Sequence, residues 1–286
     1  MRWSRTDSEH YRRRGGGGGF GLPAVAGGGA GIVGLLVLLA TVLLGGGGGG
    51  GGLPGFGEQL QDDPNAPPSE DEQFVEFLAE DTQAVWNDIF VQDGRQYEFA
   101  GVNTFAGQVQ TGCGGATSAV GPFYCPADSQ VYLDLDFFDE LASRFDAPGD
   151  FAQAYVVAHE IGHHVQNLVG TSAEVRAREQ AAGSEEEANE WSVRLELQAD
   201  CYAGVWANSV YQRGQEDPQG DVGLEEGDIE EGMAAAEAVG DDRIQAQAGM
   251  EVSPETWTHG SSEQRRRWFM TGFESGDWTR CDTFSA

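Results

Sequence analysis

Three residues near the middle of the chain have the types and the spacing that metal-assisted hydrolysis needs. His159, Glu160 and His163 form a His-Glu-x-x-His motif. On a helix the two histidines are one turn apart and project from the same face, so both imidazoles can bind one Zn²⁺. Glu160 stands beside them and can act as general base for a water that the metal activates. The motif predicts a zinc-dependent hydrolase, and ordinary core or surface histidines are the alternative.

A third metal ligand is expected from a downstream segment that carries two carboxylates. Glu196 and Asp200 are four residues apart, so they share one face of a predicted helix. Apolar residues such as Leu195 and Tyr202 surround them, and a carboxylate there is costly unless it is paired or bound to a metal. We expect Glu196 to be the third zinc ligand and Asp200 to accept a hydrogen bond from a ligand imidazole. Two solvated carboxylates on an acidic helix are the alternative.

A histidine near the end of the chain is a further catalytic candidate. His259 comes just before Ser261 and Gln264, which have the spacing of a capping box, so it precedes the start of a predicted helix. From that position its imidazole can reach into a cleft and donate a hydrogen bond to a developing oxyanion. A purely structural histidine is the alternative interpretation.

The hydrophobic pattern predicts the elements that must position these residues. Apolar residues recur every three or four positions around the motif, which indicates a helix that ends at Gly170. Residues 130–137 alternate as a half-buried strand with Asp134 and Asp136 on its solvated face, where a cation site is the alternative. The other predicted segments are a helix at 69–90 that begins with a capping box, loops with short strands at 93–127, a helix at 138–145, and a helical region at 172–213 that is interrupted near residue 183.

The N-terminal part of the chain differs in composition from the rest. Residues 1–19 are basic, whereas residues 20–44 carry no charge and are long enough to span the ~30 Å hydrocarbon core of a membrane as a helix. We favour a retained anchor over a cleaved signal peptide, because no A-x-A site follows the apolar run. Since the arginines precede the span, we expect a cytoplasmic tail and an extracytoplasmic domain, in a single-pass protein of the cell membrane. Residues 45–70 read as a flexible tether, and residues 71–286 form the remaining domain.

The overall charge restricts the kinds of partner. The formal net charge is −31, and the chain contains no lysine. Such a surface repels nucleic acid, so we expect no nucleic-acid partner. A high-salt environment or a biased genome would each produce this composition.

Four cysteines lie beyond the predicted span, and an even number in an exported domain indicates two disulfides with three possible connectivities. We favour Cys113–Cys125, because these residues bracket a glycine-rich loop, and Cys201–Cys281 by elimination. No C-x-x-C spacing points to a cysteine metal site.

Three segments together resemble the neutral zinc metallopeptidases of the YpfJ-like family. They are His159-Glu-Ile-Gly-His163-His-Val-Gln, Glu196-Leu-Gln-Ala-Asp200-Cys201 and Thr258-His259-Gly-Ser-Ser-Glu-Gln-Arg265. The resemblance covers about residues 71–286. It implies an α+β, zincin-like fold that is mostly helical, with a small sheet packed on the active-site helices. The strand at 131–137 is expected to pair with an extended substrate at a sheet edge.

The order of the motifs is also similar to that in the HtpX and Ste24 class of gluzincins. Those proteins have a late Thr-His-Pro-Pro with an arginine six residues after the histidine, and here Gly and Ser replace the two prolines. By this resemblance Glu196 is the third zinc ligand, and Asp200 orients the site. His259 stabilises the transition state, and Arg265 pairs near Asp200.

These observations predict a membrane-anchored zinc metallopeptidase, an endopeptidase of peptide or protein substrates. One Zn²⁺ per chain is held by His159, His163 and Glu196, and Glu160 passes the proton of the water to the leaving amine. The alternative is a catalytically silent, membrane-tethered binding or structural module on the same fold. Glu160 favours the enzyme, since a structural metal site needs no base beside the metal.

Overall fold

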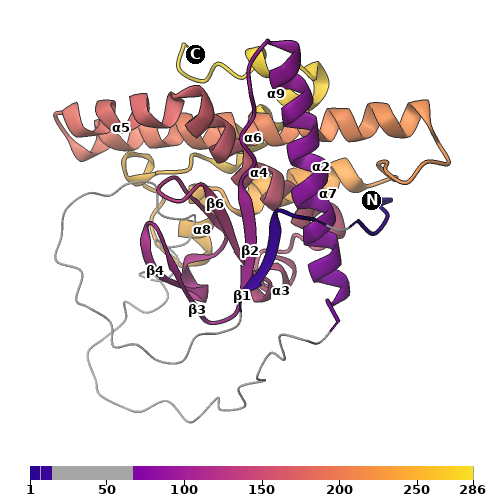
Figure 1. Cartoon of the computed structure of the whole chain (residues 1–286). Coiled ribbons are helices and arrows are strands. Elements are labelled where there is room, and N and C mark those ends of the chain that lie inside the picture. Colours follow the sequence, from indigo (N-terminus) through magenta and orange to yellow (C-terminus); the bar gives the residue numbers. More distant parts are fainter. Residues whose placement is uncertain (7, 15–66, 286) are drawn as a thin grey trace, which may run out of the picture.

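The computed structural model describes residues 1–6, 8–14 and 67–285. These residues form a mainly helical fold with two small sheets, which confirms the predicted mixed architecture. In Figure 1 the long helix α6 runs across the molecule, and the sheets lie below it. The helices of the described residues are α2 (Glu70–Gln92), α3 (Asp136–Ser143), α4 (Asp150–Val169), α5 (Thr171–Ala181), α6 (Glu185–Glu216), α7 (Asp228–Ala238), α8 (Asp241–Gln247) and α9 (Ser262–Ser275).

Local signals account for several helix ends. Both predicted capping boxes are present, with Ser69 before α2 and Ser261 before α9. Gly170 ends α4 in the left-handed conformation, which a residue without Cβ adopts at no steric cost. The predicted interruption near residue 183 separates α5 from α6. These boundaries depend on contacts within a few residues, and therefore the sequence pattern finds them.

The larger sheet has the strand order β1 (Tyr11–Arg14), β2 (Gly101–Phe105), β6 (Gln130–Asp134) and β5 (Phe123–Cys125). β2 is parallel to both of its neighbours, and β5 is antiparallel to β6. The second sheet is a hairpin of β3 (Gln108–Thr111) and β4 (Gly114–Thr117). Within the described strands, β5 is therefore the outer strand at one side of the larger sheet.

Strand β6 corrects two expectations. It is an inner strand: β2 pairs with it along its whole length and β5 covers its other edge at residues 130–132, so it is not the edge strand that we expected to pair with a substrate. It is also buried on both faces. Val131 and Leu133 join the main core, and Tyr132 packs in a smaller cluster with residues of the hairpin. Asp134 is 2% exposed and accepts a hydrogen bond from the Ser118 hydroxyl, so the predicted solvated position is wrong.

The N-terminal segment packs on the domain and departs from the predicted separate tail. Strand β1, indigo in Figure 1, lies beside β2, and the backbone of Arg2 bonds to that of Gly223. Arg13 pairs with Glu72 on α2, so the acidic domain compensates the basic charge of this segment.

The predicted membrane span at 20–44 lies outside the described residues, as does most of the predicted tether at 45–70. Among the helices that the structure describes, none combines the length and the apolar character needed to cross a bilayer. The membrane anchor and the extracytoplasmic location therefore stay predictions.

Helix α4 occupies the centre of the fold and packs against α2, α5, α6, α7, β5 and β6. Its buried face includes both motif histidines. Gly162 allows the close approach of α6, because a Cβ at this position would lie 3.1 Å from the carbonyl oxygen of Ala199. Similarly, a Cβ at Gly272 of α9 would collide with the backbone of Cys201 on α6. These two glycines bring α4, α6 and α9 together at the level of the motifs.

Both predicted disulfides are confirmed. Cys113–Cys125 ties the tip of the β3–β4 hairpin to β5. Cys201–Cys281 ties the C-terminal segment to the middle of α6, across 80 residues of sequence. Cys201 directly follows Asp200 on α6, so the second disulfide anchors the C-terminal segment next to the candidate site.

Candidate metal centre

The structure brings together the three residues expected to bind zinc. His159 and His163 project from α4, and Glu196 faces them from α6. Nε2 of His159 is 3.3 Å from one carboxylate oxygen of Glu196, and Nε2 of His163 is 3.4 Å from the other. One donor atom from each of the three residues lies within 4.8 Å of the others. Two imidazoles and one carboxylate are a ligand set that catalytic zinc sites use.

The two imidazoles make their hydrogen bonds through Nδ1, which leaves their Nε2 atoms available to a metal. Nδ1 of His159 is 2.9 Å from Asp200, and Nδ1 of His163 is 2.9 Å from the side-chain oxygen of Gln166. Nε2 of His159 is buried and has no hydrogen-bond partner among the described residues. A buried, unsatisfied nitrogen is costly, and a metal ion at this point would satisfy it. The residues therefore fit a zinc ion.

The electrostatics of the centre favour a cation. Burial opposes charge on Glu196, but His163 and His159 hold the pKa of its carboxyl well below the ordinary value. Burial likewise lowers the pKa of His159, but Asp200 and Glu196 outweigh it and raise that pKa to about 9. Glu196 also raises the pKa of His163 against the effect of burial. An ionised carboxylate thus faces two basic nitrogens in a largely buried site.

Glu160 lies next to the centre and is 3% exposed. Burial raises the pKa of its carboxyl, while the charges of His163 and His159 and the backbone N–H of Tyr124 in β5 lower it. The carboxylate is thus positioned between the ligand histidines and the outer strand of the sheet. The charge of Glu196 adds to the rise in the pKa of Glu160, which suits a group that must accept a proton.

Asp200 and Arg265 form a fully buried ion pair behind His159. Nε and Nη2 of Arg265 donate to the two oxygens of Asp200, each at 2.8 Å. The Tyr155 hydroxyl donates to Asp200 at 2.5 Å and accepts from Arg265 at 3.1 Å. Burial alone would raise the pKa of Asp200, but Arg265 and His159 lower it. The predicted pairing of these two residues is present, and it orients the carboxylate that holds His159.

His259 is held by Asp241, which the sequence pattern did not reveal. Nδ1 of His259 is 3.2 Å from one oxygen of Asp241 and 2.9 Å from the Thr258 hydroxyl. The other oxygen accepts hydrogen bonds from the backbone N–H groups of Thr258, His259 and Gly260. The charge of His259 contributes to the low pKa of Glu196, so the imidazole lies near enough to the metal centre to act on its charge. The start of α8 in sequence carries no sign of this long-range contact.

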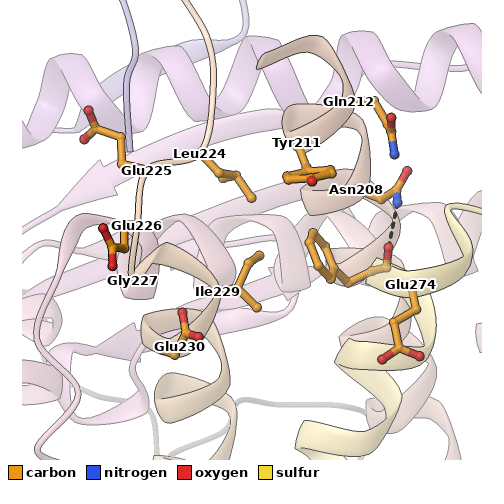
Figure 2. Close-up of a pocket in the computed structure, with 11 residues that line it drawn as sticks. Asn208, Tyr211, Gln212, Leu224, Glu225, Glu226, Gly227, Ile229, Glu230 and Glu274 are labelled. Carbon is orange, nitrogen blue, oxygen red and sulfur yellow. Dashed lines mark hydrogen bonds between the residues drawn. The ribbon is translucent and has the colours of Figure 1, made fainter. Parts of the chain in front are cut away.

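Two other features of the described residues do not belong to this centre. Asp150, Asp228 and Glu231 form a second acidic group, but the amino group of Met1 lies 2.6 Å from Asp150 and 3.2 Å from Asp228. A hollow of about 860 Å³ lies between the end of α6, α7 and α9, with Tyr211 and Ile229 among its apolar residues and several glutamates beside them (Figure 2). None of the candidate ligands lines it.

Comparison with known proteins agrees with the geometry. A model of the family described as "Putative neutral zinc metallopeptidase" matches residues 1–284. The "Uncharacterized protein YpfJ" of Escherichia coli K12 is 46% identical over 228 residues, which are 79% of this chain and 76% of that protein. The "Uncharacterized protein Rv2575" of Mycobacterium tuberculosis H37Rv is 50% identical over 208 residues, 71% of this chain and 67% of that protein. No solved structure matches the chain. The match covers both the motif helices and the N-terminal segment, and the chain therefore belongs to the neutral zinc metallopeptidase family.

Proposed function

We propose that this protein is a zinc-dependent peptidase that binds one Zn²⁺ per chain through His159, His163 and Glu196. The observation that carries the proposal is the convergence of the two Nε2 atoms on Glu196, with the buried Glu160 carboxyl beside them. A metal site that serves only the fold has no use for a base at this position. The family description supports the same reaction class.

Different residues of the chain have different roles in the proposed reaction. When bound, zinc polarises the scissile carbonyl and lowers the pKa of the attacking water. Glu160 accepts the proton of that water and then passes it to the leaving amine. Asp200 keeps the proton of His159 on Nδ1, so that Nε2 stays free for the metal.

His259 is proposed to stabilise the developing oxyanion. Its Nδ1–H donates to Asp241, and an imidazole in that orientation carries a proton on Nε2 only in the charged form. In the charged form the imidazole pairs with the Asp241 carboxylate through Nδ1 and can donate from Nε2 to the substrate.

An extended peptide is the proposed form of the substrate. Strand β5 is the outer described strand on the side of α4, and Tyr124 at its centre reaches Glu160 through its backbone N–H. A peptide that added to this edge would run past the general base. β5 thus replaces β6 as the strand that we expect to hold the substrate.

Zinc content tests the ligand set. The purified full chain is expected to contain one zinc, and Glu196→Ala is expected to lose it or to bind it far more weakly, because one of three protein ligands is missing. Glu190→Ala, at an exposed position of the same helix, is the matched control and should keep its zinc. Elemental analysis after dialysis measures the zinc content of the wild type and of both variants. Full zinc in Glu196→Ala, or no zinc in the wild type, would contradict the proposal.

Steady-state kinetics test the role of His259. His259→Ala is expected to lower kcat by about 10²–10³-fold with unchanged zinc content, the usual effect of removing one oxyanion donor. Asp241→Asn is expected to lower kcat less, and to add little when combined with His259→Ala, because it acts through that imidazole. An unchanged kcat in His259→Ala would leave this histidine a structural role only.

A further inference from the structure

Two buried glutamines connect the second zinc ligand to the C-terminal segment. The Gln166 side-chain oxygen is 2.9 Å from Nδ1 of His163, and its nitrogen donates to the Gln198 oxygen at 3.1 Å. The Gln198 nitrogen then donates to the backbone oxygen of Cys281 at 2.9 Å. Gln166 is fully buried, and Gln198 and Cys281 are 7% and 1% exposed. The chain of hydrogen bonds runs from α4 through α6 to a segment that follows α9.

The hydrogen-bond donors and acceptors between His163 and Cys281 allow only one orientation of the Gln166 amide. The Gln166 nitrogen donates to two acceptors, the Gln198 oxygen and the backbone oxygen of Leu195 at 2.7 Å. The reversed amide would place its oxygen against the oxygens of Leu195 and Gln198, with no hydrogen-bond donor between them. The Gln166 oxygen must therefore face His163 and accept its Nδ1–H. This bond leaves the Nε2 lone pair of His163 directed toward Glu196.

The far end of the chain of hydrogen bonds is covalently anchored. Cys281 is joined to Cys201 of α6, and the Thr283 hydroxyl donates to the backbone oxygen of Arg194 at 2.6 Å. These two attachments hold the carbonyl that accepts from Gln198. Apart from them, the segment after α9 has little regular structure, with only a short 3-10 turn at Trp278–Arg280. The disulfide is therefore the strongest constraint on the position of that carbonyl.

We propose that Gln166 and Gln198 are positioning residues for the zinc ligand His163, and that the Cys201–Cys281 disulfide fixes them in place. The inference rests on the proposed zinc site and adds to it a dependence of the metal affinity on the intact disulfide. Without the disulfide, the Cys281 carbonyl can move away from Gln198. The Gln198 side chain, which accepts a hydrogen bond from Gln166, is then no longer held in position. His163 can then rotate, and the affinity for zinc falls.

Zinc affinity of the full chain, measured by competition with a chromogenic chelator, tests this inference. Gln166→Met fills the same space without an acceptor for His163, and is expected to weaken zinc binding by about 10–100-fold. Gln166→Glu keeps an acceptor and is expected to bind zinc more tightly than Gln166→Met. Gln198→Met and the double variant Cys201→Ala/Cys281→Ala should weaken binding in the same direction. The visible spectrum of the Co²⁺-loaded protein reports the ligand geometry in each case.

Gln83→Met is the matched control. Gln83 is also fully buried, and its amide bonds to the backbone of Ala79 and Ala100, away from the metal centre. The Gln83→Met substitution should lower the melting temperature of the apo protein without changing its zinc affinity. Wild-type affinity in Gln166→Met, or an equal loss in Gln83→Met, would overturn the inference. If the wild type binds no zinc, or if Glu196→Ala binds it as tightly as the wild type, the proposed zinc site itself fails.

Discussion

Replacing Glu160 with Gln is expected to lower the rate of peptide hydrolysis by about 10²–10⁴-fold, the usual contribution of a general base. The amide has the shape of the carboxylate but cannot accept the proton of the attacking water. Zinc should remain bound at the wild-type level, because the ligand atoms come from His159, His163 and Glu196. The two results together separate catalysis from metal binding.

The measurement uses a peptide library to find a cleaved sequence with the wild type, followed by kinetics on that peptide. Glu160→Asp is the companion variant. It keeps a carboxylate at a shorter reach and is expected to retain more activity than Glu160→Gln. A wild-type rate of peptide hydrolysis in Glu160→Gln would contradict the proposed mechanism. A zinc-loaded wild type that cleaves nothing in the library would favour the binding or structural module instead.

Replacing Arg265 with Met is expected to destabilise the fold by about 3–5 kcal/mol, because it leaves the Asp200 carboxylate buried without its partner. Asp200 is completely buried and receives two hydrogen bonds from Arg265. Methionine fills much of the space of the arginine stem but donates to neither oxygen. Because Asp200 also holds Nδ1 of His159, zinc binding should weaken as well.

Urea unfolding of the metal-free protein, followed by circular dichroism, measures this effect without a contribution from bound zinc. Arg178→Met is the control. Arg178 pairs with Glu174 at 3.3 Å on the exposed face of α5, and such pairs contribute about 0.3–0.5 kcal/mol. A loss in Arg265→Met no greater than in Arg178→Met would show that the buried pair does not hold α9 against α6.

Several features of the site depend on residues that are close in sequence, and these were predictable. The spacing of His159 and His163, and that of Glu196 and Asp200, places each pair on one helix face whatever the rest of the chain does. The capping boxes and the end of α4 at Gly170 are equally local. The pairing of the cysteines followed from the short loop between Cys113 and Cys125, which left the other two for each other.

The errors concern partners that are far apart in sequence. The alternation of residues 130–137 predicts one solvated face, but the packing of the β3–β4 hairpin on Tyr132 covers it. The pairing of the N-terminal strand with the domain was also missed, whereas the membrane anchor at 20–44 stays a prediction. Pairing of β1 with β2 requires a contact across about 90 residues, which no local pattern encodes.

The sequence by itself determined which side chains can bind a metal and on which helix face each one lies, because helical periodicity follows from backbone geometry alone. Only the tertiary structure decided how those faces meet. The close approach of α4, α6 and α9, which Gly162 and Gly272 permit, brings Glu196 to the histidines and Arg265 to Asp200. The partners of His163 and His259 were also decided there, since buried polar groups take whichever donors and acceptors the packing leaves within reach.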